Sequence, residues 1–202
     1  MHIVDGALTT EVLLIGAALT GLGLMQGLRS MPLEKIPATG MLAATFFVAS
    51  LIHVPLGPSS VHLIMNGVAG ILLGWAAVPA LFVGLLLQAI FFGYGGITVL
   101  GVNACNIALP AVLVYYLIRP FIVRASVRQQ FIFGAFGGGL AVAGSTLMVA
   151  ASLWFSGEEF IPAAKLVLVS HIPVIFIEAL LSGATLYLVA KVKPELFMGR
   201  SW

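Results

Sequence analysis

Long apolar runs are the feature that most restricts how this chain can fold. From 36 to 118 there is no Asp, Glu, Lys or Arg. Over all 202 residues, 61% are hydrophobic and 8% are charged, whereas soluble domains carry about 25% charged residues. Strands of membrane barrels alternate apolar and polar residues, and these runs are continuous. We therefore expect an all-α, polytopic protein that spans a lipid bilayer as one domain over 1–202.

Seven segments are apolar enough to form helices, although a full span needs about 20 such residues and the third is shorter. Their expected ranges are Thr9–Leu28, Ala38–Val54, Ser59–Leu73, Val78–Phe92, Asn103–Val123, Phe131–Phe155 and Ala163–Lys191. The third and fourth are weakly separated, because only Gly74-Trp75-Ala76 interrupts the apolar run between them.

Basic residues then orient the helices. With seven spans, every Lys and Arg except Lys165 falls on one face: Arg29, Lys35, Arg119, Arg124, Arg128, Lys191, Lys193 and Arg200. The positive-inside rule makes that face cytoplasmic, so we expect the N-terminus outside and the C-terminus inside. The loop from Pro55 to Ser60 would share the outer face with Met1-His2, and His62 would lie just inside the next helix. Scattered basic residues give no sign of nucleic-acid binding.

The first two residues can form a metal chelate. No basic region precedes an apolar core here, so we expect no signal peptide, and Met1 should be retained before the bulky His2. The amine of Met1, the backbone nitrogen of His2 and the His2 ring can then bind one ion. A fourth nitrogen from His62 would complete a square, which suits Ni(II) or Cu(II).

Four further polar residues are candidates near such a site. His53 could be a fifth ligand or line the path of the ion, or it could be an interfacial histidine. Asp5 could orient the His2 ring, stabilise the start of the first helix, or do both. Asn66 and Asn103 could act at the site, although hydrogen bonds between helices are at least as common a role.

Three further residues lie deeper in the chain. Cys105 is better explained as a small buried residue than as a ligand. His171 and Glu178 lie two turns apart on one helix face, and a carboxylate within a span should have a partner. We expect a hydrogen-bonded structural role for Glu178.

Several segments together resemble the NikM/CbiM family, the substrate-binding S components of energy-coupling factor (ECF) transporters for nickel and cobalt. The opening Met1-His2-Ile3-Val4-Asp5-Gly6 is similar to the family's N-terminus. The other similar segments are Pro58–Leu63 with Asn66-Gly67, Gly70–Trp75, Leu87-Gln88-Ala89, Phe92–Asn103, and Ile172-Pro173 with Glu178. The resemblance implies that Met1, His2 and His62 bind the metal. Val61-His62-Leu63 and Asp5-Gly6 are closer to the nickel type than to the cobalt type, which feeds cobalamin synthesis.

The resemblance also implies partners and a location. An ECF system has a transmembrane T component, ATPase subunits and, in some cases, a small accessory membrane subunit, and it lies in the prokaryotic cytoplasmic (inner) membrane. This chain has no nucleotide-binding Gly-x-x-x-x-Gly-Lys-Ser/Thr sequence, so we expect no ATP site and no enzymatic activity of its own. Two other classes remain open: an intramembrane metalloenzyme using His62, His171 and Glu178, and a structural membrane subunit.

Overall fold

The structure is a computed structural model that describes residues 2–51, 53–56 and 59–198. Its elements, in chain order, are α1 (Thr10–Arg29), η1 (Leu33–Lys35), α2 (Ile36–Ala49), β1 (His53–Leu56), β2 (Ser59–His62), α3 (Asn66–Leu73), η2 (Gly74–Ala76), α4 (Ala77–Phe92), α5 (Leu100–Ile122), α6 (Val127–Trp154), η3 (Glu158–Phe160), α7 (Ile161–Val192) and α8 (Glu195–Met198).

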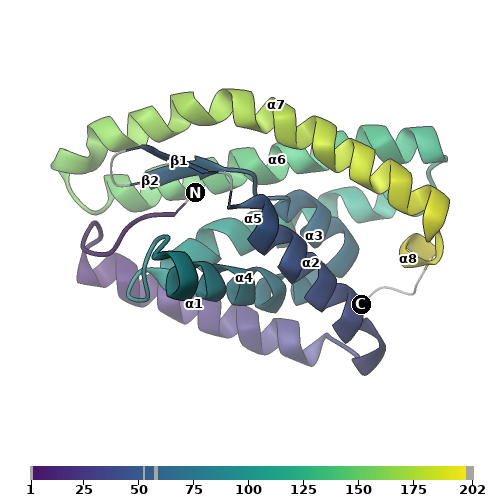
Figure 1. Ribbon diagram of the computed structural model, residues 1–202, viewed down its shortest axis with the longest axis horizontal. Helices are drawn as coiled ribbons and strands as arrows, with labels where there is room; N and C mark the ends of the chain where they lie inside the picture. Colours follow the sequence, from purple (N-terminus) through teal and green to yellow (C-terminus); the bar gives the residue numbers. More distant parts are fainter. Residues whose placement is uncertain (1, 52, 57–58, 199–202) are drawn as a thin grey trace.

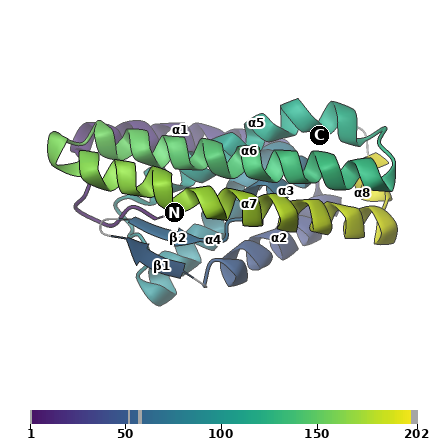
Figure 2. The same cartoon turned by 90° about the horizontal axis from the view of Figure 1, so that it is seen from above.

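The helices form one elongated bundle. Helices α6 and α7 run side by side along one edge, α1 runs along the opposite edge, and α3, α4 and α5 lie between them (Figures 1 and 2). The N-terminal segment before α1 turns back toward the hairpin formed by β1 and β2 (Figure 1). The two strands are antiparallel, with His53 opposite His62 and Leu56 opposite Ser59.

Five segments in the described part of the chain are long and apolar enough to cross a membrane. They are Thr10–Arg29, Asn66–Phe92, Leu100–Ile122, Val127–Trp154 and Glu158–Val192. The expected number of seven spans is therefore not confirmed. Helix α2 has 14 residues, about 21 Å at 1.5 Å per residue, which falls short of a hydrocarbon core about 30 Å thick. Helices α3 and α4 together with η2 make up a single apolar segment.

Two predicted helices differ from the structure. The second ends at Ala49 rather than Val54, and the third begins at Asn66 rather than Ser59. Strands β1 and β2 occupy the sequence between them, so His62 lies at the end of a strand and not inside a helix. The sequence of a short apolar run does not distinguish a strand from a helix. Here the backbones of β1 and β2 pair with each other, and the segment therefore forms strands.

Small residues allow the central helices to approach closely. A methyl group on Gly67 of α3 would lie 2.6 Å from the Cα atom of Gly138 in α6. Such contacts are typical of helix packing in membranes, where small side chains let backbones meet. The eight residues of α3 are all buried as a result, and this short helix is held between α5, α6 and α4.

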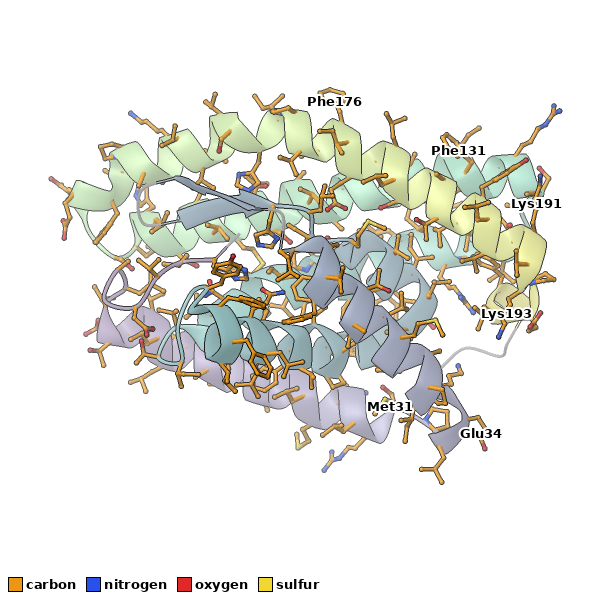
Figure 3. The ribbon with its side chains drawn as sticks, viewed as in Figure 1. Met31, Glu34, Phe131, Phe176, Lys191 and Lys193 are labelled. Atoms are coloured by element: carbon orange, nitrogen blue, oxygen red, sulfur yellow. The ribbon has the colours of Figure 1, made fainter. Side chains whose placement is uncertain are left out.

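The basic tail and the connection after α1 meet at one end of the bundle. Lys35 and Lys193 line the same groove there. Lys191 and Lys193 lie at the same end of the long axis as Met31 and Glu34 (Figure 3). The structure therefore gathers these basic residues as the charge argument requires, while the side of the membrane on which they lie stays a prediction.

Candidate metal centre

The N-terminal segment is fixed to α5 immediately after His2. Asn103 binds both backbone groups of Ile3: its Oδ1 accepts from the Ile3 nitrogen at 2.9 Å, and its Nδ2 donates to the Ile3 oxygen at 3.0 Å. Both residues are buried. An amide side chain can do this because it offers one donor and one acceptor side by side. Asn103 therefore determines where the backbone of His2 enters the protein.

Asp5 attaches the same segment to the loop between α4 and α5. Its carboxylate accepts hydrogen bonds from the Thr98 hydroxyl and from the Val99 nitrogen, and its own nitrogen donates to the Gly95 oxygen at 3.2 Å. The loop needs glycine at 96, where φ is +145° and a side chain would collide with the Asp5 carboxylate. Asp5 thus secures the loop, and a role in orienting the His2 ring stays a prediction.

His62 is presented at the end of β2 with one ring nitrogen available. Its Nδ1 lies 2.8 Å from the Leu63 oxygen, so Nδ1 carries the proton and donates it to that carbonyl. Its Nε2 is buried and has no hydrogen-bond partner among the residues that the structure describes. Burial lowers the pKa of His62 well below its ordinary value near 6.5. The ring is therefore neutral at physiological pH and its Nε2 lone pair can bind a metal.

The structure brings His2 and His62 together. Their ring centroids are 4.5 Å apart with planes inclined by 20°, and each residue is 3% exposed. The ring of Tyr94 also stacks with His2, with ring centroids 6.3 Å apart. Residues 60 positions apart in the sequence thus place two imidazoles in contact within the protein interior, while their predicted role as metal ligands stays a prediction.

Side chains alone do not complete a metal site in the described part of the chain. No group of three or more His, Cys, Asp or Glu side chains there converges on a point that could hold an ion. A metal bound by His2 and His62 would consequently need ligands other than the His, Cys, Asp and Glu side chains of the described residues. Met1, whose amine is a predicted ligand, lies outside the described residues.

The remaining candidates have other partners. Asn66 donates to the Ile107 oxygen and to the Ser145 hydroxyl, both at 2.9 Å, and so links α3 to α5 and α6. His53 pairs with His62 through the backbone, and its side chain lies outside the described residues. Cys105 is buried in α5.

The two candidates on α7 are also buried. The Nδ1 atom of His171 lies 2.7 Å from the Val167 oxygen of its own helix. The side chain of Glu178 is 0% exposed and accepts hydrogen bonds from the nitrogens of Ile64 and Met65. Glu178 therefore has the hydrogen-bonded role that we expected for it.

Two residues near the site were missed from the sequence. Tyr94 stacks on His2, and Thr98 binds Asp5. Both belong to the glycine-rich loop after α4, and this glycine content was the signal available in the sequence. Gly95 and Gly96 both have positive φ, which is typical of a backbone that approaches another segment closely.

Comparison with known proteins decides the family. The family described as the cobalt uptake substrate-specific transmembrane region matches residues 2–196. The chain belongs to this family. A Haemophilus influenzae member with a provisional name as a metal transport protein is 42% identical over 198 residues, which cover 97% of this chain and 96% of the relative.

Two further comparisons agree with this assignment. The fused nickel transport protein NikMN of Rhodobacter capsulatus is 39% identical over 115 residues, 54% of this chain and 33% of that longer protein. The crystal structure of a transition metal transporter superposes with a TM-score of 0.80 at 25% identity, covering 95% of this chain and 93% of the transporter. The chain is thus a multi-pass inner-membrane protein of a metal transporter family.

Proposed function

We propose that this chain captures Ni(II) at the outer face of the membrane as the substrate-binding subunit of an ATP-driven ECF importer. The ion is bound by the Met1 amine, the backbone nitrogen and ring of His2, and His62. The contact between the rings of His2 and His62 carries the proposal, because two neighbouring buried imidazoles can supply two nitrogen ligands to one transition-metal ion.

The spacing of the two rings agrees with the proposed square. The terminal amine, the His2 amide and the His2 ring occupy three consecutive corners, so His62 takes the corner next to the His2 ring. With metal–nitrogen bonds of about 2.0 Å, imidazoles on adjacent corners place their ring centres roughly 4.5 Å apart. The observed separation is 4.5 Å, and because the rings are stacked with planes inclined by only 20°, they must turn before both nitrogens face one ion.

The nitrogen-only ligand set favours nickel over cobalt. Square-planar nitrogen sites suit Ni(II) and Cu(II), and binding through a deprotonated amide favours the same ions. Relatives carry names that refer to nickel and to cobalt. A cobalt-type S component that feeds cobalamin synthesis is accordingly the alternative, and competition between Ni(II) and Co(II) for the purified protein distinguishes the two.

The transport cycle needs other subunits. We assign ATP hydrolysis to separate ATPase subunits and force transmission to a transmembrane T component, with a small accessory membrane protein in systems that contain one. Vesicles containing the whole assembly should accumulate nickel only when ATP is present, and this chain alone should bind the ion without accumulating it.

The decisive experiment adds one residue before Met1. The extension moves the amine away from the site and leaves every side chain in place, so Ni(II) affinity measured by calorimetry should fall at least 100-fold. His2→Ala and His62→Ala should also lose most affinity. A protein extended by one residue at its C-terminus is the matched control and should bind normally. Unchanged binding by the N-terminally extended protein would refute the proposed ligand set.

A further inference from the structure

Glu178 occupies an unusual place for a carboxylate. It lies near the middle of α7, the longest helix, and its side chain is 0% exposed. Both of its oxygens accept hydrogen bonds from the segment between β2 and α3: the Met65 nitrogen lies 3.0 Å from Oε1 and 3.1 Å from Oε2, and the Ile64 nitrogen donates to Oε1.

The bond to Ile64 leads directly to His62. The Ile64 nitrogen and the Leu63 oxygen belong to the same peptide unit, which is planar and rigid. That oxygen accepts the hydrogen bond from His62 Nδ1. A continuous chain of hydrogen bonds therefore runs from the Glu178 carboxylate through one peptide unit to the imidazole, and it ends at the Nε2 atom proposed to bind the metal.

The bond to Met65 holds the same segment in a conformation that the chain rarely adopts. Met65 has φ 53° and ψ 19°, in the left-handed region, and it is the only non-glycine residue with positive φ among those described. This turn carries the chain from the strand into α3. With Glu178 in place, the peptide that faces His62 cannot rotate away without losing three hydrogen-bond contacts.

Fixing the turn does not by itself require a charge. Neutral Ser, Thr or Asn side chains accept from backbone nitrogens at helix starts, and a carboxylate within a membrane span is costly to insert. A carboxylate does more in a hydrogen-bond chain, because it strengthens the successive bonds and makes the terminal imidazole a better donor to a metal.

We infer that Glu178 is a positioning residue of the metal centre, which orients and polarises His62 through the Leu63–Ile64 peptide. The inference rests on the proposed function, since it takes His62 as a ligand. It assigns α7 a role in binding the ion that acts through the backbone of the segment between β2 and α3.

Two substitutions separate positioning from simple capping of α3. Glu178→Leu removes both acceptors, and Glu178→Gln retains one acceptor oxygen without the charge. With the native N-terminus present, we expect Glu178→Leu to reduce Ni(II) affinity 10- to 100-fold and Glu178→Gln to cause a smaller loss. Ser182→Ala is the control: Ser182 lies one turn further on the same buried face of α7, and its hydroxyl has no hydrogen-bond partner among the described residues.

The tautomer of His62 provides a readout that a structural role would not change. In protein labelled with 15N-histidine and free of metal, NMR should show His62 protonated on Nδ1 in the wild type and a mixture of tautomers in both Glu178 variants. If both variants keep the wild-type tautomer and affinity, the inference is wrong, whatever their melting temperatures. Should Glu178→Leu fail to fold, Glu178→Gln alone decides by the same criteria.

Failure of the proposed function would appear differently. If His62→Ala bound Ni(II) as tightly as the wild type, His62 would not be a ligand and the capture mechanism itself would be wrong. If His62→Ala lost binding while the Glu178 variants kept it, capture would stand and only the role of Glu178 would be overturned.

Discussion

Single residues determine how accurately the N-terminal segment is placed, and Asn103 is the clearest case. Its side chain satisfies both backbone groups of Ile3, one residue after a proposed ligand. Flexible chain ends are normally poorly ordered unless they are tied down. With Ile3 fixed in this way, His2 lies directly beside the anchor, so its ring and its backbone nitrogen have little freedom.

We predict that Asn103→Leu lowers Ni(II) affinity 10- to 100-fold. The substitution leaves the buried nitrogen and oxygen of Ile3 without their partners, which costs about 1–3 kcal/mol for each unsatisfied group. Calorimetry of the purified protein measures the affinity, and thermal unfolding measures stability.

Asn106→Leu is the matched control for this prediction. Asn106 lies one turn further along α5 and exchanges hydrogen bonds with Ser152 of α6 rather than with the N-terminal segment. Its loss should lower the melting temperature and leave Ni(II) affinity within about twofold, because the bond that it breaks joins two helices. Equal affinity losses in the two variants would contradict a specific role for Asn103.

For single residues, the sequence indicated which side chains could bind a metal but not which groups the other polar side chains would contact. The sequence suggested pairing His2 with His62 for two reasons. A chelate at the N-terminus needs a fourth nitrogen, and the charge argument put both residues on the same face. The partners of Asp5 and Asn103 could not be predicted, since a carboxylate or amide can bind any nearby backbone group and the sequence does not say which one approaches. The role of Tyr94 depends on the path of a glycine-rich loop, which the sequence leaves undetermined.

Close contacts between helices depend on glycines, which have no side chain to keep the backbones apart. A methyl group on Gly138 would meet the side chain of Ser182 and lie 3.0 Å from the backbone carbonyl oxygen of Glu178. We predict that Gly138→Ala forces α6 and α7 apart and destabilises the protein by about 1–3 kcal/mol, the usual cost of overpacking. Thermal unfolding in detergent would show this as a lower melting temperature.

Gly21→Ala is the control for that prediction. A methyl group on Gly21 in α1 has nothing within 4 Å. The change should be neutral or stabilising by up to about 1 kcal/mol, because alanine is the better helix former. A loss of stability in Gly21→Ala equal to that in Gly138→Ala would mean that close packing does not explain the glycine at 138.

The long helices were predictable and the segment that carries His62 was not. Expected ranges for the first and last helices, Thr9–Leu28 and Ala163–Lys191, lie within two residues of α1 and α7 at each end, because long apolar runs between charged or turn-forming residues have few alternatives. The β-hairpin was missed because its stability comes from pairing between its own strands and packing against α7. Neither contact leaves a periodic pattern in so short a sequence.

For the whole molecule, the main prediction is its orientation. Glu34 lies in the connection between α1 and α2, and Glu159 lies in the connection between α6 and α7. With the basic end in the cytoplasm, a membrane-impermeant thiol reagent added outside intact cells should label Glu159→Cys and leave Glu34→Cys unlabelled.

The native cysteine provides the background for this measurement. Cys105 is 5% exposed and should not react in the folded protein. In inside-out vesicles the labelling should reverse, so that Glu34→Cys reacts and Glu159→Cys does not. Labelling of Glu34→Cys from outside the cell would place the basic end there and would remove the proposed capture site from the outer face.

The pairing of β1 with β2 also sets a condition on holding the ion. Neighbouring side chains of a strand point to opposite faces, so a slip of one residue turns every side chain over. With His62 opposite His53, the His62 ring lies against His2. A shift by a single residue would turn that ring away and separate it from His2, while every helix stayed where it is. With the proposed ligand set, retention of the ion would thus depend on whether the four residues of β2 pair with β1 in this register.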